Sequence, residues 1–191
     1  MAGVLLRFRP PTAAQLVARL EACRDAPLTY APAGVSLTDA VPPSGLVRRS
    51  WTTELTGVDA FARAADALDA WGVHRTAGLD VAADGPVAVG TNVALSAPLP
   101  FFFVDATCRV VAVVREPDRW GFAYGTLVAH PERGEESFLV VRGADGRVRF
   151  RVDAVSQPAH PLAPVLPGIA HRWQDATVRR YLAAMRSLTA E

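Results

Sequence analysis

A helical hydrophobic period opens and closes the chain. Near the start, Thr12 and Gln15 match a capping box in front of an apolar stripe, which predicts a helix over residues 11–24. Near the end, apolar residues recur mostly four apart over residues 165–188, while Asp175 and several arginines occupy the opposite face. A helix with one apolar face needs a partner surface, and we expect a sheet to provide it.

A third helical stripe covers residues 58–71. Thr56 and Asp59 repeat the capping pattern at its start, and Gly72 stands where a C-cap is expected. The segment LVRRSWTTEL, which lies before this stripe, is expected to contain a strand.

After Gly72 the hydrophobic period changes from helical to alternating. The segments predicted as strands are VAVGTNVAL, CRVVAVVRE, WGFAYGTL, ESFLVVR and RVRFRVDAV. Short connections between them favour an antiparallel meander. We therefore expect a single α+β domain over residues 1–191, in which a curved antiparallel β-sheet wraps around a long C-terminal helix and two shorter helices lie toward the N-terminus.

The predicted strand WGFAYGTL has two unequal faces. The bulky face carries Trp120, Phe122, Tyr124 and Thr126, and the other carries Gly121, Ala123, Gly125 and Leu127. A face of glycine and alanine does not fill space by itself. We expect a closely packed helix, a cavity or a β-bulge there.

The stretch VAHPERGEE follows this strand and has the composition of a connection. One interpretation is a hairpin loop whose glutamates are solvated. The alternative places His130 at the mouth of a cavity, with Glu132, Glu135 or Glu136 orienting its ring. His130 and Glu132 match half of a zinc-deaminase signature, but the paired cysteines that such a site needs are absent from the sequence.

Composition and charge narrow the classes of function. Lys+Arg is 20 and Asp+Glu is 19, so the formal net charge of +1 does not predict a nucleic-acid partner. Every basic residue is arginine, and Cys23 and Cys108 lie far apart outside any CxxC motif. The sequence has no HExxH motif, Gly-rich phosphate loop or GxSxG elbow, so neither a metal nor a cofactor is expected. Prolines interrupt the uncharged run over residues 86–104, so we expect no transmembrane segment and a cytoplasmic location.

The run GFAYGTLVAHPERGEESF resembles the signature of the domain-of-unknown-function family nineteen-ninety of bacteria and plants. Other matching pieces follow the same order: LTYAPAG, FARAADALDAWGVHRTAGL, CRVVAVV, DAVSQP and RRYLAAM. The resemblance implies the helix-grip architecture of START and Bet v 1-like proteins, in which sheet and helix enclose an apolar cavity. It implies no particular biochemical activity.

The leading hypothesis is a protein that binds a small apolar or amphipathic molecule between the sheet and the C-terminal helix. The candidate ligand-binding residues are Trp71, His74, Tyr124, Thr126, His130, Glu132, Glu136 and Arg180. One alternative is a hydrolase or isomerase that uses His130 with a glutamate as an acid–base pair. Another is a protein–protein interaction module, suggested by the proline-rich residues 158–167 or by Phe101–Phe103, which leaves a homo-oligomer open.

Overall fold

The computed structural model describes residues 6–159 and 167–190. The strands are β1 (Leu6–Arg7), β2 (Val47–Leu55), β3 (Asp80–Ala83), β4 (Asn92–Pro98), β5 (Phe103–Arg115), β6 (Arg119–Thr126), β7 (Glu132–Arg142) and β8 (Val148–Pro158). The helices are α1 (Ala13–Ala22), the short 3-10 helix η1 (Val35–Leu37), α2 (Ala60–Asp69), α3 (Gly72–Thr76) and α4 (Pro167–Thr189).

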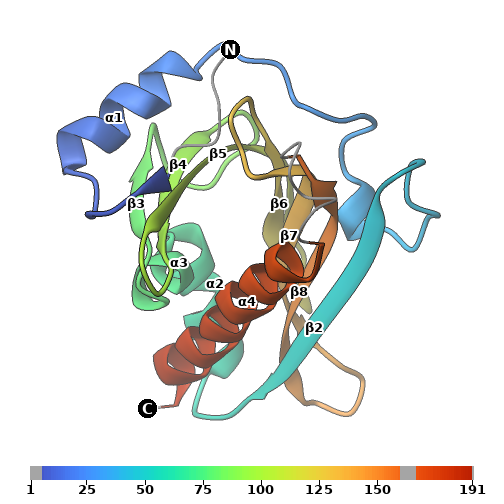
Figure 1. Cartoon of the computed structure of the whole chain (residues 1–191). Helices are drawn as coiled ribbons and strands as arrows, with labels where there is room; N and C mark the ends of the chain where they lie inside the picture. Colours follow the sequence, from blue (N-terminus) through green and yellow to red (C-terminus); the bar gives the residue numbers. More distant parts are fainter. Residues whose placement is uncertain (1–5, 160–166, 191) are drawn as a thin grey trace.

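The strands form one antiparallel sheet with the order β2-β8-β7-β6-β5-β4-β3, and β1 pairs with β5 beside this path. Strands β3 to β8 are neighbours in the order of the chain, which confirms the predicted meander. Figure 1 shows the sheet curving around α4, with α2 and α3 packed near the C-terminal half of that helix. The predicted α+β fold, a curved sheet around a long terminal helix, is confirmed.

Both terminal helices form where their periods predict them. Thr12 is the N-cap of α1, and its capping box with Gln15 is complete in both directions. In α4, Tyr181, Leu182 and Met185 are buried against the sheet. Residues 160–166, which include most of the proline-rich segment, lie outside the described residues, so its interpretation stays a prediction.

The boundaries predicted for the second helix are wrong. Its N-cap is Asp59, which has φ 56° and no side-chain cap, so the pattern starting at Thr56 is not a capping box. Helix α2 ends at Asp69, and Trp71 adopts φ 58° before α3 begins at Gly72. The chain turns here because Trp71 is drawn into the core, where it is almost completely buried. A capping pattern in the local sequence does not indicate that the Trp71 ring must reach the core.

Strand β3 was not predicted, and β4 begins at Asn92 instead of within residues 87–91. Residues 87–91 form part of the connection between these strands, where Gly90 adopts φ 95°. Strand β3 is short and lies at the edge of the sheet, so its alternating pattern covers only four residues.

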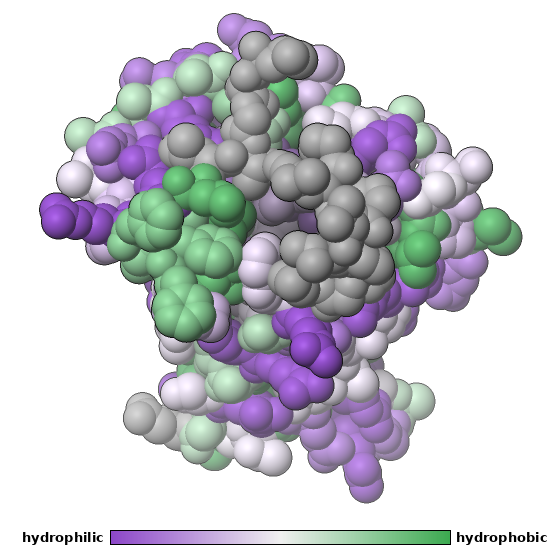
Figure 2. Space-filling view, viewed as in Figure 1, coloured by the Kyte–Doolittle hydropathy of each residue, from purple (hydrophilic) through white to green (hydrophobic). Residues whose placement is uncertain are grey.

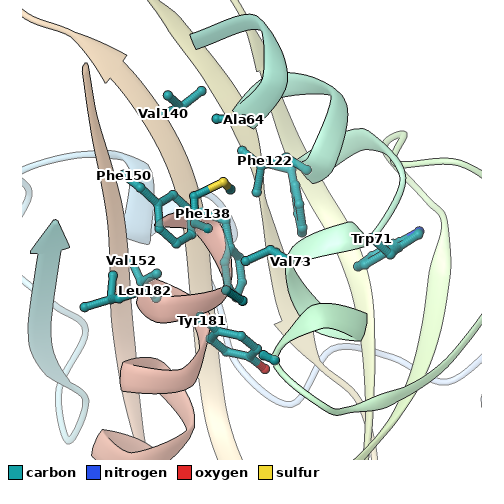
Figure 3. Close-up of a cluster of buried hydrophobic side chains, with 14 of the residues drawn as sticks. Ala64, Trp71, Val73, Phe122, Phe138, Val140, Phe150, Val152, Tyr181 and Leu182 are labelled. Carbon is teal, nitrogen blue, oxygen red and sulfur yellow. The ribbon is translucent and has the colours of Figure 1, made fainter. Parts of the chain in front are cut away.

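Aromatic side chains fill the space between the middle of the sheet and the C-terminal half of α4. Figure 3 shows Phe122, Phe138 and Phe150 of the sheet facing Tyr181 and Leu182 of the helix. The three phenylalanines are fully buried, and the Phe138 and Tyr181 rings pack edge to face with centroids 5.3 Å apart. The sequence led us to expect an apolar cavity here, but these side chains occupy that space.

Contacts on both flanks hold α4 in the grip. On one flank, Arg49 of β2 donates a hydrogen bond to Asp175 at 3.0 Å. On the other, the Trp173 ring packs against Phe102 with centroids 5.2 Å apart, and Arg180 donates to the carbonyl oxygen of Pro98 at 3.0 Å. The helix is therefore fixed between β2 and the turn that joins β4 to β5.

The glycine and alanine face of β6 points outward, and residues 28–36 cover its Gly125 end. A Cβ atom on Gly125 would lie 2.5 Å from the Tyr30 hydroxyl oxygen and 2.8 Å from Cδ2 of Leu28, so only glycine permits this close approach. A loop covers this face, instead of the helix or cavity that were considered. The β-bulge lies in the partner strand β5, between Val110 and Ala112.

The carboxylate of Glu135 fastens residues 28–36 to this outer face. It accepts hydrogen bonds from the Tyr30 hydroxyl, from the Gly34 amide at 2.7 Å, and from the amide and hydroxyl of Ser36 at 2.8 and 2.6 Å. Glu135 is only 1% exposed, and these four donors compensate for the burial of its charge.

We predict that Glu135→Gln lowers the free energy of unfolding by about 2–4 kcal/mol, because an amide keeps one acceptor oxygen but turns an N–H group toward the remaining donors. Urea denaturation measures the change. The matched control is Glu54→Gln, because Glu54 is exposed and its carboxylate forms a surface ion pair with Arg147 at 3.4 Å. A loss for Glu135→Gln no larger than that of the control would contradict the role assigned to this carboxylate.

Candidate functional site

A small polar cavity lies where the N-terminal half of α4 crosses the ends of β6, β7 and β8. Its volume is about 30 Å³, and its lining residues are Tyr124, Thr126, His130, Glu132, Glu135, Glu136 and Ser156. A space of this size holds roughly two water molecules. We call this region the polar end of the grip. The aromatic core lies farther along α4, against its C-terminal half.

The strand β7 begins at Glu132, earlier than the sequence indicated, so the three glutamates belong to a strand. Only residues 127–131 connect β6 to β7, so Glu132, Glu135 and Glu136 lie on the strand and not in a solvated loop. The hairpin-loop interpretation is therefore wrong for the glutamates. Side chains alternate along a strand, so Glu132 and Glu136 face inward while Glu135 faces outward.

Glu136 lies opposite Tyr124 in the pairing of β6 with β7. The Tyr124 hydroxyl donates to Oε2 of Glu136 at 2.9 Å. Burial raises the pKa of Glu136 to about 8, the nearby charge of Glu132 adds to this shift, and the hydrogen bond from Tyr124 opposes it. At neutral pH Glu136 is therefore mainly a protonated carboxylic acid, which is able to donate a hydrogen bond.

Glu132 connects the sheet to α4. Its Oε2 accepts hydrogen bonds from the Ser156 hydroxyl at 2.8 Å and from Nε2 of Gln174 at 2.9 Å. Gln174 in turn accepts from Arg49 at 3.1 Å. Burial raises the pKa of Glu132, while the hydrogen bond from Ser156 and the charge of Arg49 act in the opposite direction.

His130 makes its hydrogen bonds with the main chain. Its Nδ1 lies 2.9 Å from the Glu132 amide nitrogen and 3.0 Å from the Glu132 carbonyl oxygen, so the tautomer of the neutral ring decides whether Nδ1 accepts or donates. Burial lowers the pKa of His130 to about 4, so the ring is neutral at pH 7. The acid–base alternative required a hydrogen bond between His130 and a glutamate carboxylate; among the described residues its ring bonds only to the Glu132 backbone.

Thr126 has a bridging position beside the cavity. Its hydroxyl lies 2.5 Å from that of Thr29 and accepts a hydrogen bond from the Gly134 amide at 3.0 Å. Thr126 thus joins the start of the segment 28–36 to β7.

Trp71 and His74 lie apart from the cavity, in the aromatic core. The His74 ring is fully buried, with its centroid 4.8 Å from that of Phe138 and 5.0 Å from that of Tyr181. Among the described residues, neither nitrogen of this ring has a hydrogen-bond partner. Burial lowers its pKa to about 3. Arg180 is also separate and reaches the β4–β5 turn.

The structure therefore brings together Tyr124, Thr126, His130, Glu132 and Glu136, and leaves out Trp71, His74 and Arg180. Sequence reasoning missed Ser156 and Gln174. Ser156 lies within the matching piece DAVSQP, and Gln174 lies seven residues before Tyr181 on the same helix face. Both are polar residues that face inward at the end of the sheet. Their orientation can be recognised only when the fold is known, so the sequence alone did not identify them.

Solved structures with a similar fold define the class of protein. A hypothetical protein from Helicobacter pylori aligns with a TM-score of 0.58 and 13% identity over 75% of this chain and 88% of its own. Ara h 8.0201 aligns with a TM-score of 0.53 and 12% identity, over 76% of this chain and 99% of its own. A START superfamily protein from Mycobacterium smegmatis aligns with a TM-score of 0.50 and 14% identity, over 76% and 100%. The fold is a helix grip of the START and Bet v 1-like kind.

The family follows from the sequence comparison. Residues 29–184 match the family described as "Domain of unknown function (DUF1990)", and the chain belongs to this family. A UPF0548 protein from Deinococcus radiodurans is 49% identical over 69 residues, and one from Dictyostelium discoideum is 29% identical over 136 residues. These alignments span 35% and 63% of the length of the two relatives, and 35% and 64% of this chain.

Within the described residues, no three or more His, Cys, Asp or Glu side chains are arranged to hold a metal ion. In the same part of the chain, every helix is too short or too polar to cross a bilayer.

The raised pKa of Glu136 predicts a pH dependence of stability. Unfolded Glu136 ionises above about pH 4.5 and folded Glu136 only above about pH 8, so the stability it contributes is complete below pH 4.5 and is lost as pH rises to 8. Between pH 6.5 and 8, the unfolding free energy of the wild type should fall by about 1.5 kcal/mol more than that of Glu136→Gln. Urea denaturation at several pH values measures both; parallel curves would refute the prediction.

His74 predicts the opposite slope in acid. The unfolded ring takes up a proton below about pH 6.5 and the folded ring only near pH 3, so stability is lost as pH falls through this window. At pH 4.5 the loss reaches about 2–3 kcal/mol. His74→Phe keeps an aromatic ring in the core and removes this titration, so its denaturation midpoint should depend less on acid pH. An unchanged acid slope would show that other groups control it.

Proposed function

We propose that this protein binds one small amphipathic molecule at the polar end of the grip. The observation that carries the proposal is the convergence of Tyr124, Glu132 and Glu136 on a cavity between the sheet and α4. The helix-grip fold supports the same class of function. The ligand's polar group occupies the cavity in place of water.

The hydrogen-bonding groups around the cavity define the chemistry of that polar group. At neutral pH, Glu136 is protonated and donates, and the His130 ring is neutral. Glu132 supplies acceptor oxygens. A site with both donors and acceptors suits an uncharged group such as a hydroxyl, carbonyl or amide.

The volume limits how much of the ligand enters. Pockets for drug-sized ligands measure about 300–1,000 Å³, an order of magnitude above the cavity at the polar end. Only the polar group fits, and the apolar part lies outside the cavity. Trp173, the residue before Gln174 on α4, is 37% exposed and supplies an aromatic surface on the same half of the helix.

A second candidate is an enzyme that transfers a proton at the same cavity. A carboxylic acid with a pKa of about 8 next to a cavity is suited to general-acid catalysis near neutral pH. This assigns the proton to Glu136, because His130 stays neutral and bonds to the main chain. Turnover of a bound molecule that stops in Glu136→Gln, with binding retained, would favour the enzyme over the binding protein.

Native mass spectrometry of the purified protein, compared with its mass after denaturation, tests the binding proposal. We expect a releasable mass of small-molecule size, either copurified or acquired from a small-molecule extract. In Ser156→Leu, the larger side chain fills the cavity and removes the hydroxyl that binds Glu132, so the adduct should be lost.

Two further variants make the result interpretable. Thr52→Leu adds similar bulk on the exposed side of β2 and should retain the adduct. Tyr124→Phe removes only the hydroxyl that binds Glu136, and it should weaken binding about tenfold, which corresponds to one hydrogen bond. An adduct that survives in folded Ser156→Leu, together with unchanged affinity in Tyr124→Phe, would place the ligand elsewhere and overturn the proposal.

A further inference from the structure

Large apolar side chains are exposed together at one lip of the grip. The lip patch consists of the exposed residues Leu6, Phe8, Phe101 and Trp173 and of the half-buried Phe102, which contacts Trp173. Phe8 is 90% exposed, Phe101 84% and Leu6 57%. Figure 2 shows a broad hydrophobic patch on the left of this face, bordered by hydrophilic residues. Contiguous exposed apolar surface of this kind marks a contact site.

The backbone brings these residues together from three separate segments. In the pairing of β1 with β5, Leu6 lies opposite Val104 and Arg7 opposite Phe103, so Phe8 continues toward the β4–β5 turn. That turn carries Phe101 and is closed by a hydrogen bond from the Leu99 amide to the Phe102 carbonyl at 2.8 Å. The contact between the Phe102 and Trp173 rings joins the turn to α4. The patch is thus a fixed part of the fold.

The charged residues that directly flank the lip patch in sequence are basic. Arg9 follows Phe8 and Arg172 precedes Trp173, and both arginines are exposed. The carboxylates closest in sequence are already paired: Asp105 is buried and binds Arg7 at 2.9 Å, and Asp175 binds Arg49 at 3.0 Å. Exposed aromatic rings next to unneutralised arginines are complementary to the interface of an anionic lipid bilayer.

We propose that the lip patch docks this protein on the surface of bilayers that contain anionic lipids. Phe8 and Phe101 enter the boundary between headgroups and acyl chains, while Arg9 and Arg172 contact the lipid phosphates. Phe8 and Phe101 are 90% and 84% exposed, so both rings project from the surface of the patch. This shape suits insertion into a soft interface better than packing against the rigid surface of a second protein.

The test is sedimentation of the full chain with vesicles of phosphatidylcholine alone, and of phosphatidylcholine mixed with phosphatidylglycerol at about 2:1. We expect binding to the anionic vesicles, weaker binding to the neutral ones, and a decrease as salt is added. Phe8→Ser with Phe101→Ser should lower the partition coefficient at least tenfold. Arg9→Gln with Arg172→Gln should lower it about tenfold at low salt and little at high salt.

The matched control is Val41→Ser with Val89→Ser. These valines are 90% and 64% exposed, and Val89 lies in the β3–β4 connection, at the opposite end of β4 from Phe101. The control should bind vesicles like the wild type, and all variants should keep the thermal midpoint of the wild type.

Two results would overturn the proposal. The first is absence of binding to anionic vesicles, or equal binding by the folded phenylalanine variant. The second is a wild-type dimer in light scattering that the phenylalanine substitutions convert to a monomer without vesicles present, because the lip patch would then be an interface between two copies of this chain.

Discussion

The burial of the Glu135 carboxylate is the constraint on which the functional end of this molecule depends. Four hydrogen bonds from Tyr30, Gly34 and Ser36 satisfy this charge on the outer face of the sheet. A shift of β7 by one residue would turn Glu135 toward the core and expose Glu136 on the outer face. The donors on the outer face therefore fix the register that places Glu136 opposite Tyr124.

The interior of the grip changes character along α4. At its C-terminal half, the phenylalanines of three neighbouring strands and Tyr181 fill the space completely. At its N-terminal half, Gln174, Glu132 and Ser156 form a hydrogen-bonded group beside the remaining cavity. Apolar side chains pack without directional needs, whereas the buried polar groups need partners at fixed distances and leave room for water between them. The buried polar and ionisable groups that could bind a ligand therefore lie beside the N-terminal half of α4.

The period of hydrophobic residues predicted most helices and strands correctly, because the alternating and helical segments are long enough for their period to be clear. The failures occurred where local and tertiary signals disagree. Asp59 and Trp71 both adopt left-handed backbone conformations that no capping pattern predicts, because the core position of the Trp71 ring sets the turn between α2 and α3. The sequence suggested solvated glutamates in VAHPERGEE for a similar reason, because their hydrogen-bond partners lie on other elements. Glu135 binds residues about a hundred positions earlier, Glu132 binds β8 and α4, and Glu136 binds Tyr124 on β6.

By itself, the sequence determined the meander, the terminal helix and the group of polar residues between Tyr124 and Glu136, because these depend on the order of residues within short segments. Only the tertiary structure decided which glutamate faces the cavity, that aromatic rings fill the expected apolar space, and that Phe8 and Phe101 meet at one lip. Each of these depends on contacts between residues distant in sequence, and the free energy of such contacts is defined only once the sheet has curved around α4.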